Sequence, residues 1–226
     1  MAETVSPSSD SDKQQEFAIE ARSNSVKQLC DLYKVVISIA VGLAFRNVVD
    51  PNASPLPVAM DTFVLLLALL VTIIPFFHGA VRHLYATYIE VGGSTRVANW
   101  VVLIDYYLLF VGGGLFVGLS SSLGHARAFA ILLTGILGLD VIWGMLSHIG
   151  FGGTQAQKAE VSWAKINLVT VVLLLTILLA EKVLSRWGFD ESAFRLFLLL
   201  IATVRTLADY YWNHSFYCPP YPTVSS

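Results

Sequence analysis

Hydrophobic runs long enough to cross a bilayer recur along most of this sequence, separated by short polar segments. A membrane-spanning helix needs about 20 largely apolar residues. The stretches that satisfy this pattern cover residues 33–49, 60–85, 97–119, 126–149, 161–184 and 193–214. The pattern therefore predicts an all-α protein, a polytopic transmembrane helix bundle with about six spans.

The residues before the first run show a different, amphipathic pattern. Apolar residues fall at helical spacing at Phe17, Ala21, Val26 and Leu29, with charged residues around the rest of the wheel. This spacing predicts an N-terminal amphipathic helix over 13–33 that lies at the membrane surface and could bind a cytoplasmic protein partner. We expect one transmembrane domain over 13–217, with disordered tails at 1–12 and 218–226, which are rich in Ser, Pro and acidic residues.

Composition supports the membrane assignment and excludes several other classes. With 55% hydrophobic and 13% charged residues, the chain is too apolar for an ordinary soluble domain. A net charge of −2 gives no basic surface for nucleic acid. Cys30 and Cys218 form no metal-binding motif, and no cofactor motif is present, so we expect no metal and no cofactor.

Lysine and arginine are more frequent on the side of the membrane that holds the N-terminus, which predicts a multi-pass cell-membrane protein with both termini in the cytoplasm.

Three local features bear on packing. Pro75 lies inside the second run, where it frees the Val71 carbonyl and predicts a kink. Gly114 and Gly118 form a GxxxG pair that would permit contact with a second copy of the chain. Ser192 is a candidate cap for the last helix.

The last run carries a polar stripe. Arg205, Asp209 and Asn213 are four residues apart, so a helix places them on one face. Charged groups at membrane depth are costly and normally face a partner, a cavity or a ligand. We therefore expect Arg205 and Asp209 to face the interior, where they either pair with groups on other helices across the bundle or form an internal ion pair that fixes the register of the helix.

Other polar residues fall at a similar depth in neighbouring runs. At a rise of about 1.5 Å per residue, Asp105 lies about 12 Å and Asn167 about 9 Å from the inner ends of their helices, and Asp140 about 13 to 15 Å. His78 and Arg82 lie near the same boundary, whereas His83 points away from their stripe and is expected at the interface. These groups share one leaflet, and the other leaflet is apolar, which favours a cavity open to one side over a pore through a monomer.

The leading hypothesis is a site in the cytoplasmic leaflet that binds or processes a lipid headgroup or a small anionic ligand. His78 or Asp209 would act as base, Arg82 and Arg205 as anion clamps, and Asp105, Asp140 and Asn213 as further ligand contacts. His148 is a further candidate for the same layer.

Two alternatives remain open at this point. One is an ion-coupled or proton-coupled transporter or an oligomeric channel, and the other is a non-catalytic sensor or subunit. The sequence does not decide whether the protein is an enzyme.

Overall fold

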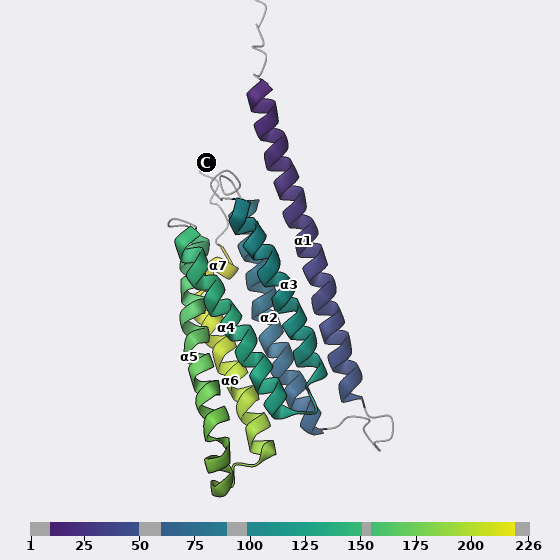
Figure 1. The fold of residues 1–226 in the computed structure, drawn as a ribbon, viewed down its shortest axis with the longest axis vertical. Coiled ribbons are helices and arrows are strands. Elements are labelled where there is room, and N and C mark those ends of the chain that lie inside the picture. The colour runs from purple at the N-terminus through teal and green to yellow at the C-terminus, as the bar shows by residue number, and fades with distance from the viewer. Residues whose placement is uncertain (1–9, 50–59, 90–98, 151–154, 220–226) are drawn as a thin grey trace, which may run out of the picture.

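The computed structural model describes residues 10–49, 60–89, 99–150 and 155–219 of the chain. These residues form helices and short connections (Figure 1). The helices are α1 (Asp10–Val48), α2 (Met60–Tyr88), α3 (Asn99–Ser121), α4 (Ala126–Gly150), α5 (Gln155–Leu184), the 3-10 helix η1 (Ser185–Trp187), α6 (Glu191–Trp212) and α7 (His214–Tyr217). The all-α prediction is confirmed for the described residues.

Five of these helices are long and apolar enough to cross a membrane. The candidate spans are Ile19–Val48, Met60–Tyr88, Val102–Ser121, Ala126–Leu146 and Lys158–Glu181. Together they support a multi-pass membrane protein. The sixth predicted span, α6, is not among them because it carries the charged residues Arg195, Arg205 and Asp209 in addition to Glu191, although its 22 residues would reach about 33 Å.

The six long helices form a closed ring. Each contacts two neighbours in the order α1, α3, α4, α5, α6, α2 and back to α1, and further contacts join α2 to α3 and to α5, and α4 to α6. Successive helices run in opposite directions, so the N-terminal end of α1, the C-terminal end of α2 and the short α7 share one end of the bundle (Figure 1). We call this the upper end.

The N-terminal region differs from the prediction. Residues 10–48 form one continuous helix of 39 residues, with no break near residue 33 between an amphipathic lead-in and a first span. Figure 1 shows the start of α1 extending beyond the rest of the bundle. The predicted tails lie outside the described residues, except that 10–12 belong to α1 and 218–219 follow α7.

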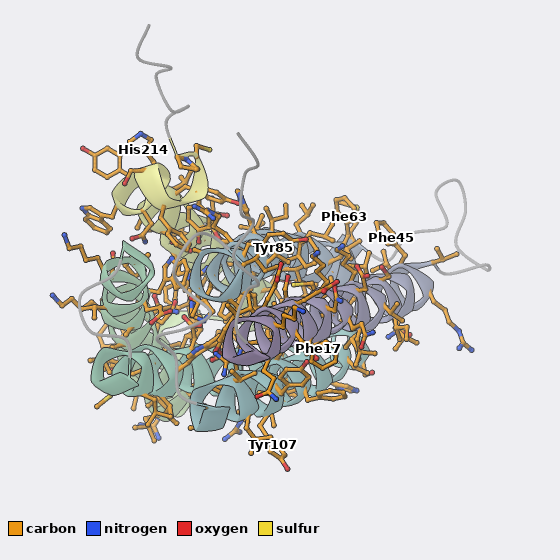
Figure 2. The ribbon with its side chains drawn as sticks, turned by 90° about the horizontal axis from the view of Figure 1, so that it is seen from above. Phe17, Phe45, Phe63, Tyr85, Tyr107 and His214 are labelled. Atoms are coloured by element: carbon orange, nitrogen blue, oxygen red, sulfur yellow. The ribbon has the colours of Figure 1, made fainter. Side chains whose placement is uncertain are left out.

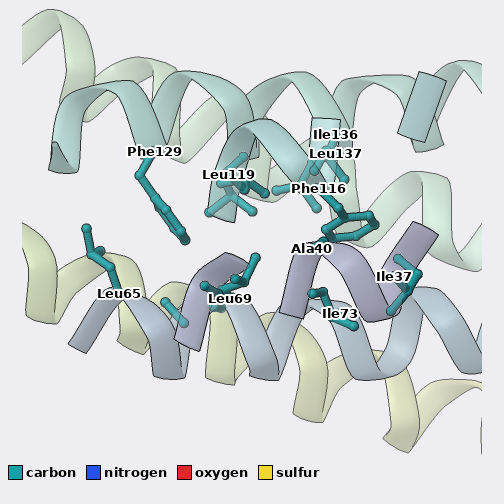
Figure 3. Close-up of a cluster of buried hydrophobic side chains, with 14 of the residues drawn as sticks. Ile37, Ala40, Leu65, Leu69, Ile73, Phe116, Leu119, Phe129, Ile136 and Leu137 are labelled. Atoms are coloured by element: carbon teal, nitrogen blue, oxygen red, sulfur yellow. The ribbon is translucent and has the colours of Figure 1, made fainter. Parts of the chain in front are cut away.

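A hydrophobic core fills the lower half of the ring. Figure 3 shows side chains from four helices meeting there, among them Leu65 and Leu69 of α2, Phe116 of α3 and Phe129 of α4. The outer surface is also apolar, and Figure 2 shows Phe45 and Tyr107 pointing away from the bundle. An apolar exterior around an apolar core is what a helix bundle in lipid requires, since the solvent on the outside is hydrocarbon.

Two polar contacts hold α6 in the ring. The Thr206 hydroxyl donates a 3.0 Å hydrogen bond to the Val71 carbonyl of α2, the acceptor that Pro75 leaves without an intrahelical donor. At the lower end, the buried Arg195 donates to the carbonyls of Asp61 and Gly124 at 2.9 and 3.2 Å. The N-cap of α6 is Asp190, whose side chain accepts from the Ala193 amide at 2.8 Å, so Ser192 is not the cap.

Candidate functional site

Two groups of buried polar side chains lie in the upper half of the ring. The first, which we call the His83 group, comprises His83 and Tyr88 of α2, Asp105 of α3 and Glu160 of α5. The second, the Arg205 group, comprises Asp140 of α4, Asn167 of α5, and Arg205, Asp209, Asn213 and Tyr217 at the end of the chain. The two groups flank one enclosed cavity.

The His83 group joins three helices through one imidazole. His83 Nδ1 pairs with Glu160 Oε1, and Nε2 lies 3.3 Å from Asp105 Oδ2. The Tyr88 hydroxyl donates to the same Asp105 oxygen at 2.5 Å. Each ring nitrogen thus faces a carboxyl oxygen, so each contact requires one hydrogen, carried either by the imidazole or by the carboxyl group.

His83 is therefore not at the interface, as the sequence pattern suggested, but 1% exposed, with the Trp143 indole packed edge-on against its ring. The sequence prediction for His83 was wrong because it assumed that the stripe of His78 and Arg82 marks the buried face of α2. Which face of α2 is buried depends instead on all the helices packed around it.

The Arg205 group contains the internal ion pair, one of the two arrangements expected from the sequence. Arg205 Nη1 lies 3.4 Å from Asp209 Oδ2, and both side chains are at least 95% buried. Arg205 Nε donates to Asn167 Oδ1 at 2.8 Å, and the Asn167 amide donates in turn to Asp140. This chain of contacts crosses from α6 through α5 to α4.

The other side of Asp209 is occupied by residues that follow α6. Asn213 donates to Oδ1 at 3.0 Å, and the Tyr217 hydroxyl lies 3.1 and 3.0 Å from the two oxygens. Burial, together with the negative charge of Asp209, raises the pKa of the Tyr217 phenol above its ordinary value of 10.0, so the hydroxyl stays protonated and donates. Because these donors and Arg205 surround the carboxylate, Asp209 is arranged to orient Arg205.

His78 and Arg82 lie beside α7 and not in either group. His78 Nδ1 is 3.2 Å from the Tyr210 hydroxyl, and its ring packs against Tyr217 with centroids 4.7 Å apart. Arg82 Nε donates to the Phe216 carbonyl at 3.1 Å, and its guanidinium lies over the Phe216 ring. Both are half-buried, and both help to hold α7 across the upper end of the ring.

The enclosed cavity has a volume of about 40 Å³, enough for about three water molecules. Its lining combines apolar residues with Asp140, Glu160, Arg205 and Asp209. Three lining side chains carry buried polar atoms with neither a hydrogen-bond nor an ion-pair partner among the described residues: Trp143 Nε1, Trp163 Nε1 and Glu160 Oε2. Buried polar groups are normally satisfied, so these atoms indicate that the cavity is hydrated or occupied.

A second, larger hollow opens to the outside between α5 and α6, and we call it the α5–α6 groove. It encloses about 660 Å³ and is lined largely by apolar side chains such as Val169, Leu173 and Val204. On α5 it extends over residues 162–173, about 16 Å. Lys165 and Trp212 lie towards its upper end, and Arg205 lines both this groove and the enclosed cavity.

Other sequence features do not converge on this site. Gly118 faces Leu132 of the same chain, where an added Cβ would lie 3.4 Å from the leucine, whereas Gly114 meets open space. The side chain of His148 lies outside the described residues. Among the residues that the structure describes, no three His, Cys, Asp or Glu side chains are placed to hold a metal ion.

Sequence reasoning missed Glu160, His83, Tyr88 and Tyr217. Glu160 was placed outside a span because the apolar run begins at residue 161, but α5 already begins at Gln155. The spacing of Leu69, Thr72, Gly79, His83 and Thr87 on α2 is helical and contains the small and polar residues that helices in membranes bury, so this face held a usable signal for His83.

Comparison with known proteins yielded no relative: no family model, no curated protein and no solved structure matches this chain.

Proposed function

We propose that this protein binds an anionic amphiphilic molecule of the bilayer in the α5–α6 groove, with its apolar tail along the groove and its head near Lys165 and Arg205. The observation that carries the proposal is the position of Arg205, which lines both the groove and the buried polar site.

The charge of the groove favours an anionic head. Lys165 and Arg205 line it, and no acidic residue is among its lining residues. Guanidinium and ammonium groups bind phosphate and carboxylate strongly where water is scarce. The enclosed cavity, by contrast, is too small for a headgroup and is lined by three carboxyl groups. The head would therefore meet Arg205 from the groove side.

In this proposal the remaining polar residues support the site. Asp209 and Asn213 orient Arg205, Asp140 fixes it through Asn167, and Asp105 belongs to the adjoining His83 group. His78 and Arg82 hold α7 over the site. The proposed activity is binding, and the catalytic role considered for His78 or Asp209 would need a substrate atom within reach of these side chains.

The proposal includes a topology. Here α6 is a sixth span, since it lies within the ring and the charged residues Arg195, Arg205 and Asp209 face inward. Both termini lie on the cytoplasmic side of the cell membrane, and the first turns of α1 form an amphipathic surface for a protein partner. Association of two copies would use the open face at Gly114.

The transport alternative receives less support. The core of the lower half is built from apolar side chains such as Leu65, Leu119, Phe129 and Leu198. A polar pathway for a transported ion would therefore have to form between several copies of the chain. The sensor alternative remains compatible with lipid binding, because the occupied groove could be what is sensed.

The test measures lipid binding to the purified protein in detergent by native mass spectrometry. Two phospholipids with the same acyl chains are compared, one with an anionic phosphatidylglycerol head and one with a zwitterionic phosphatidylcholine head. We expect preferential binding of the anionic lipid, and a loss of about fivefold in Lys165→Gln, which corresponds to about 1 kcal/mol for one cation near the headgroups.

A second pair of variants tests the groove itself. Val204→Trp fills the groove, and Val172→Trp adds the same bulk at a valine of the same exposure, 57% against 56%, that does not line it. We expect only Val204→Trp to abolish the preference. Equal binding of both lipids, or equal effects of the two tryptophans, would refute the proposal.

A further inference from the structure

The enclosed cavity carries more negative charge than a buried site tolerates. Four carboxyl groups lie in the two groups around it: Asp105, Asp140, Glu160 and Asp209. The buried bases there are Arg205 and His83. If all six were charged, the site would hold a net charge of about −2. Unpaired charges in a low-dielectric interior cost several kcal/mol each, so compensation is required.

We propose that the enclosed cavity is a hydrated proton-binding site, in which the His83 group and the Arg205 group share at least one bound proton through cavity water. Glu160 is the central residue, because its Oε1 pairs with His83 while its buried Oε2 has no hydrogen-bond partner among the described residues and its side chain lines the cavity. A proton on Oε2 would donate to cavity water, and water would connect it to Asp140.

The cavity lining distinguishes a proton from a metal cation. Two of the three unpartnered atoms around it are nitrogen donors, on Trp143 and Trp163. Donors repel a cation but satisfy the oxygen of a water molecule. Hard metal cations require about six oxygen ligands, and the described residues contain no suitable cluster. A proton on a carboxyl group neutralises the charge without a coordination shell.

Other titratable groups lie in the upper half of the bundle, and all but Tyr217 are outside the two groups. They are Arg22 and Tyr33 on α1, His78 and Arg82 on α2, Tyr106 on α3, Lys165 on α5, Tyr210 on α6 and Tyr217 on α7. Arg22 and Arg82 are half-buried near the upper end, and Lys165 is exposed, so solvent and headgroups screen these cations. These three cations reduce the excess negative charge, but none of them lines the cavity.

The inference does not rest on lipid binding, since it uses the enclosed cavity and not the groove. Infrared spectroscopy of the protein in nanodiscs tests it, because a protonated carboxyl group has a C=O stretching band separate from that of a carboxylate. We expect this band in the wild-type protein at pH 7, and a decrease by roughly half in Glu160→Gln, since removing one carboxyl group lowers the excess negative charge from about −2 to about −1 and only one proton is then needed for neutrality. Asp140→Asn should act in the same direction.

Glu181→Gln is the matched control, because Glu181 lies at the lower end and pairs with Arg127 at the surface. It should leave the band unchanged. Absence of the band in the wild-type protein would overturn the proposal without any variant. So would a band that neither Glu160→Gln nor Asp140→Asn reduces. Replacing Na⁺ and K⁺ in the buffer by choline should have no effect, and a spectrum that depends on these ions would assign the cavity to a metal cation instead.

Discussion

The contact between Thr206 and the Val71 carbonyl gives the sharpest test of how α6 is held. Pro75 has no amide hydrogen, so the carbonyl four residues earlier has no donor within α2. The Thr206 hydroxyl of α6 supplies one at 3.0 Å. In lipid there is no water to replace it, and nearby hydroxyl groups are what makes proline tolerable in a membrane helix.

Thr206→Val keeps the shape of the side chain and removes the donor. Interhelical hydrogen bonds in membrane proteins contribute about 0.6 kcal/mol on average and at most about 1.7. The Val71 carbonyl has no alternative donor in its own helix, so we expect a cost of about 1 to 1.5 kcal/mol, near a tenfold increase in the unfolding constant. Unfolding in mixed micelles with increasing sodium dodecyl sulfate, followed by circular dichroism, measures this difference.

A double-mutant cycle with Pro75→Ala isolates the hydrogen bond. The alanine of that variant has a backbone amide hydrogen that can donate to the Val71 carbonyl, so Thr206→Val should cost almost nothing in that background. The change in hydrophobicity from threonine to valine is the same in both backgrounds and cancels. Thr203→Val is the control, because Thr203 donates to Leu199 of its own helix. An equal cost of Thr206→Val with and without Pro75 would refute the reasoning.

Three further substitutions test the packing and the polar groups, each by the same unfolding measurement. Gly144→Ala should destabilise by about 1 to 2 kcal/mol, because a Cβ there would lie 2.7 Å from the Glu160 carbonyl oxygen, whereas Gly138→Ala meets open space and should be neutral or gain up to about 1 kcal/mol. Arg195→Gln should cost about 1 to 3 kcal/mol by leaving buried carbonyls at the lower end without donors, and a cost near zero would show that lipid headgroups replace them. Tyr88→Phe should cost about 1.5 to 3 kcal/mol through loss of the bond to Asp105, and an unchanged stability would mean that this carboxyl group finds another donor.

Helix formation and membrane character follow from local information. Apolar runs of about 20 residues predict helices whatever their neighbours are, because the backbone must satisfy its own hydrogen bonds in lipid. The gathering of the polar groups at one end of the bundle could also be predicted from the sequence, because the rise per residue converts sequence position into depth along the helix. The ion pair of Arg205 and Asp209 required only their separation of four residues on one helix.

Bonding partners depended on the order of the helices around the ring. The depth of each residue along its helix could not show that the polar residues form two groups beside the cavity and not one layer. It also could not predict that His83 pairs with Glu160, which lies 77 positions later in the chain. The donor for the Val71 carbonyl was likewise undetermined, because several hydroxyl groups lie at a similar depth.

The sequence by itself therefore determined the class of protein, the approximate positions of the helices and the end of the bundle at which the polar residues gather. These depend on hydropathy and helix periodicity, which are local. Only the tertiary structure decided that α5 closes against His83, that α7 covers Asp209, and that Arg205 lies between a polar cavity and an apolar groove open to the outside. Such contacts depend on which helix faces are adjacent, and that is a property of the whole ring.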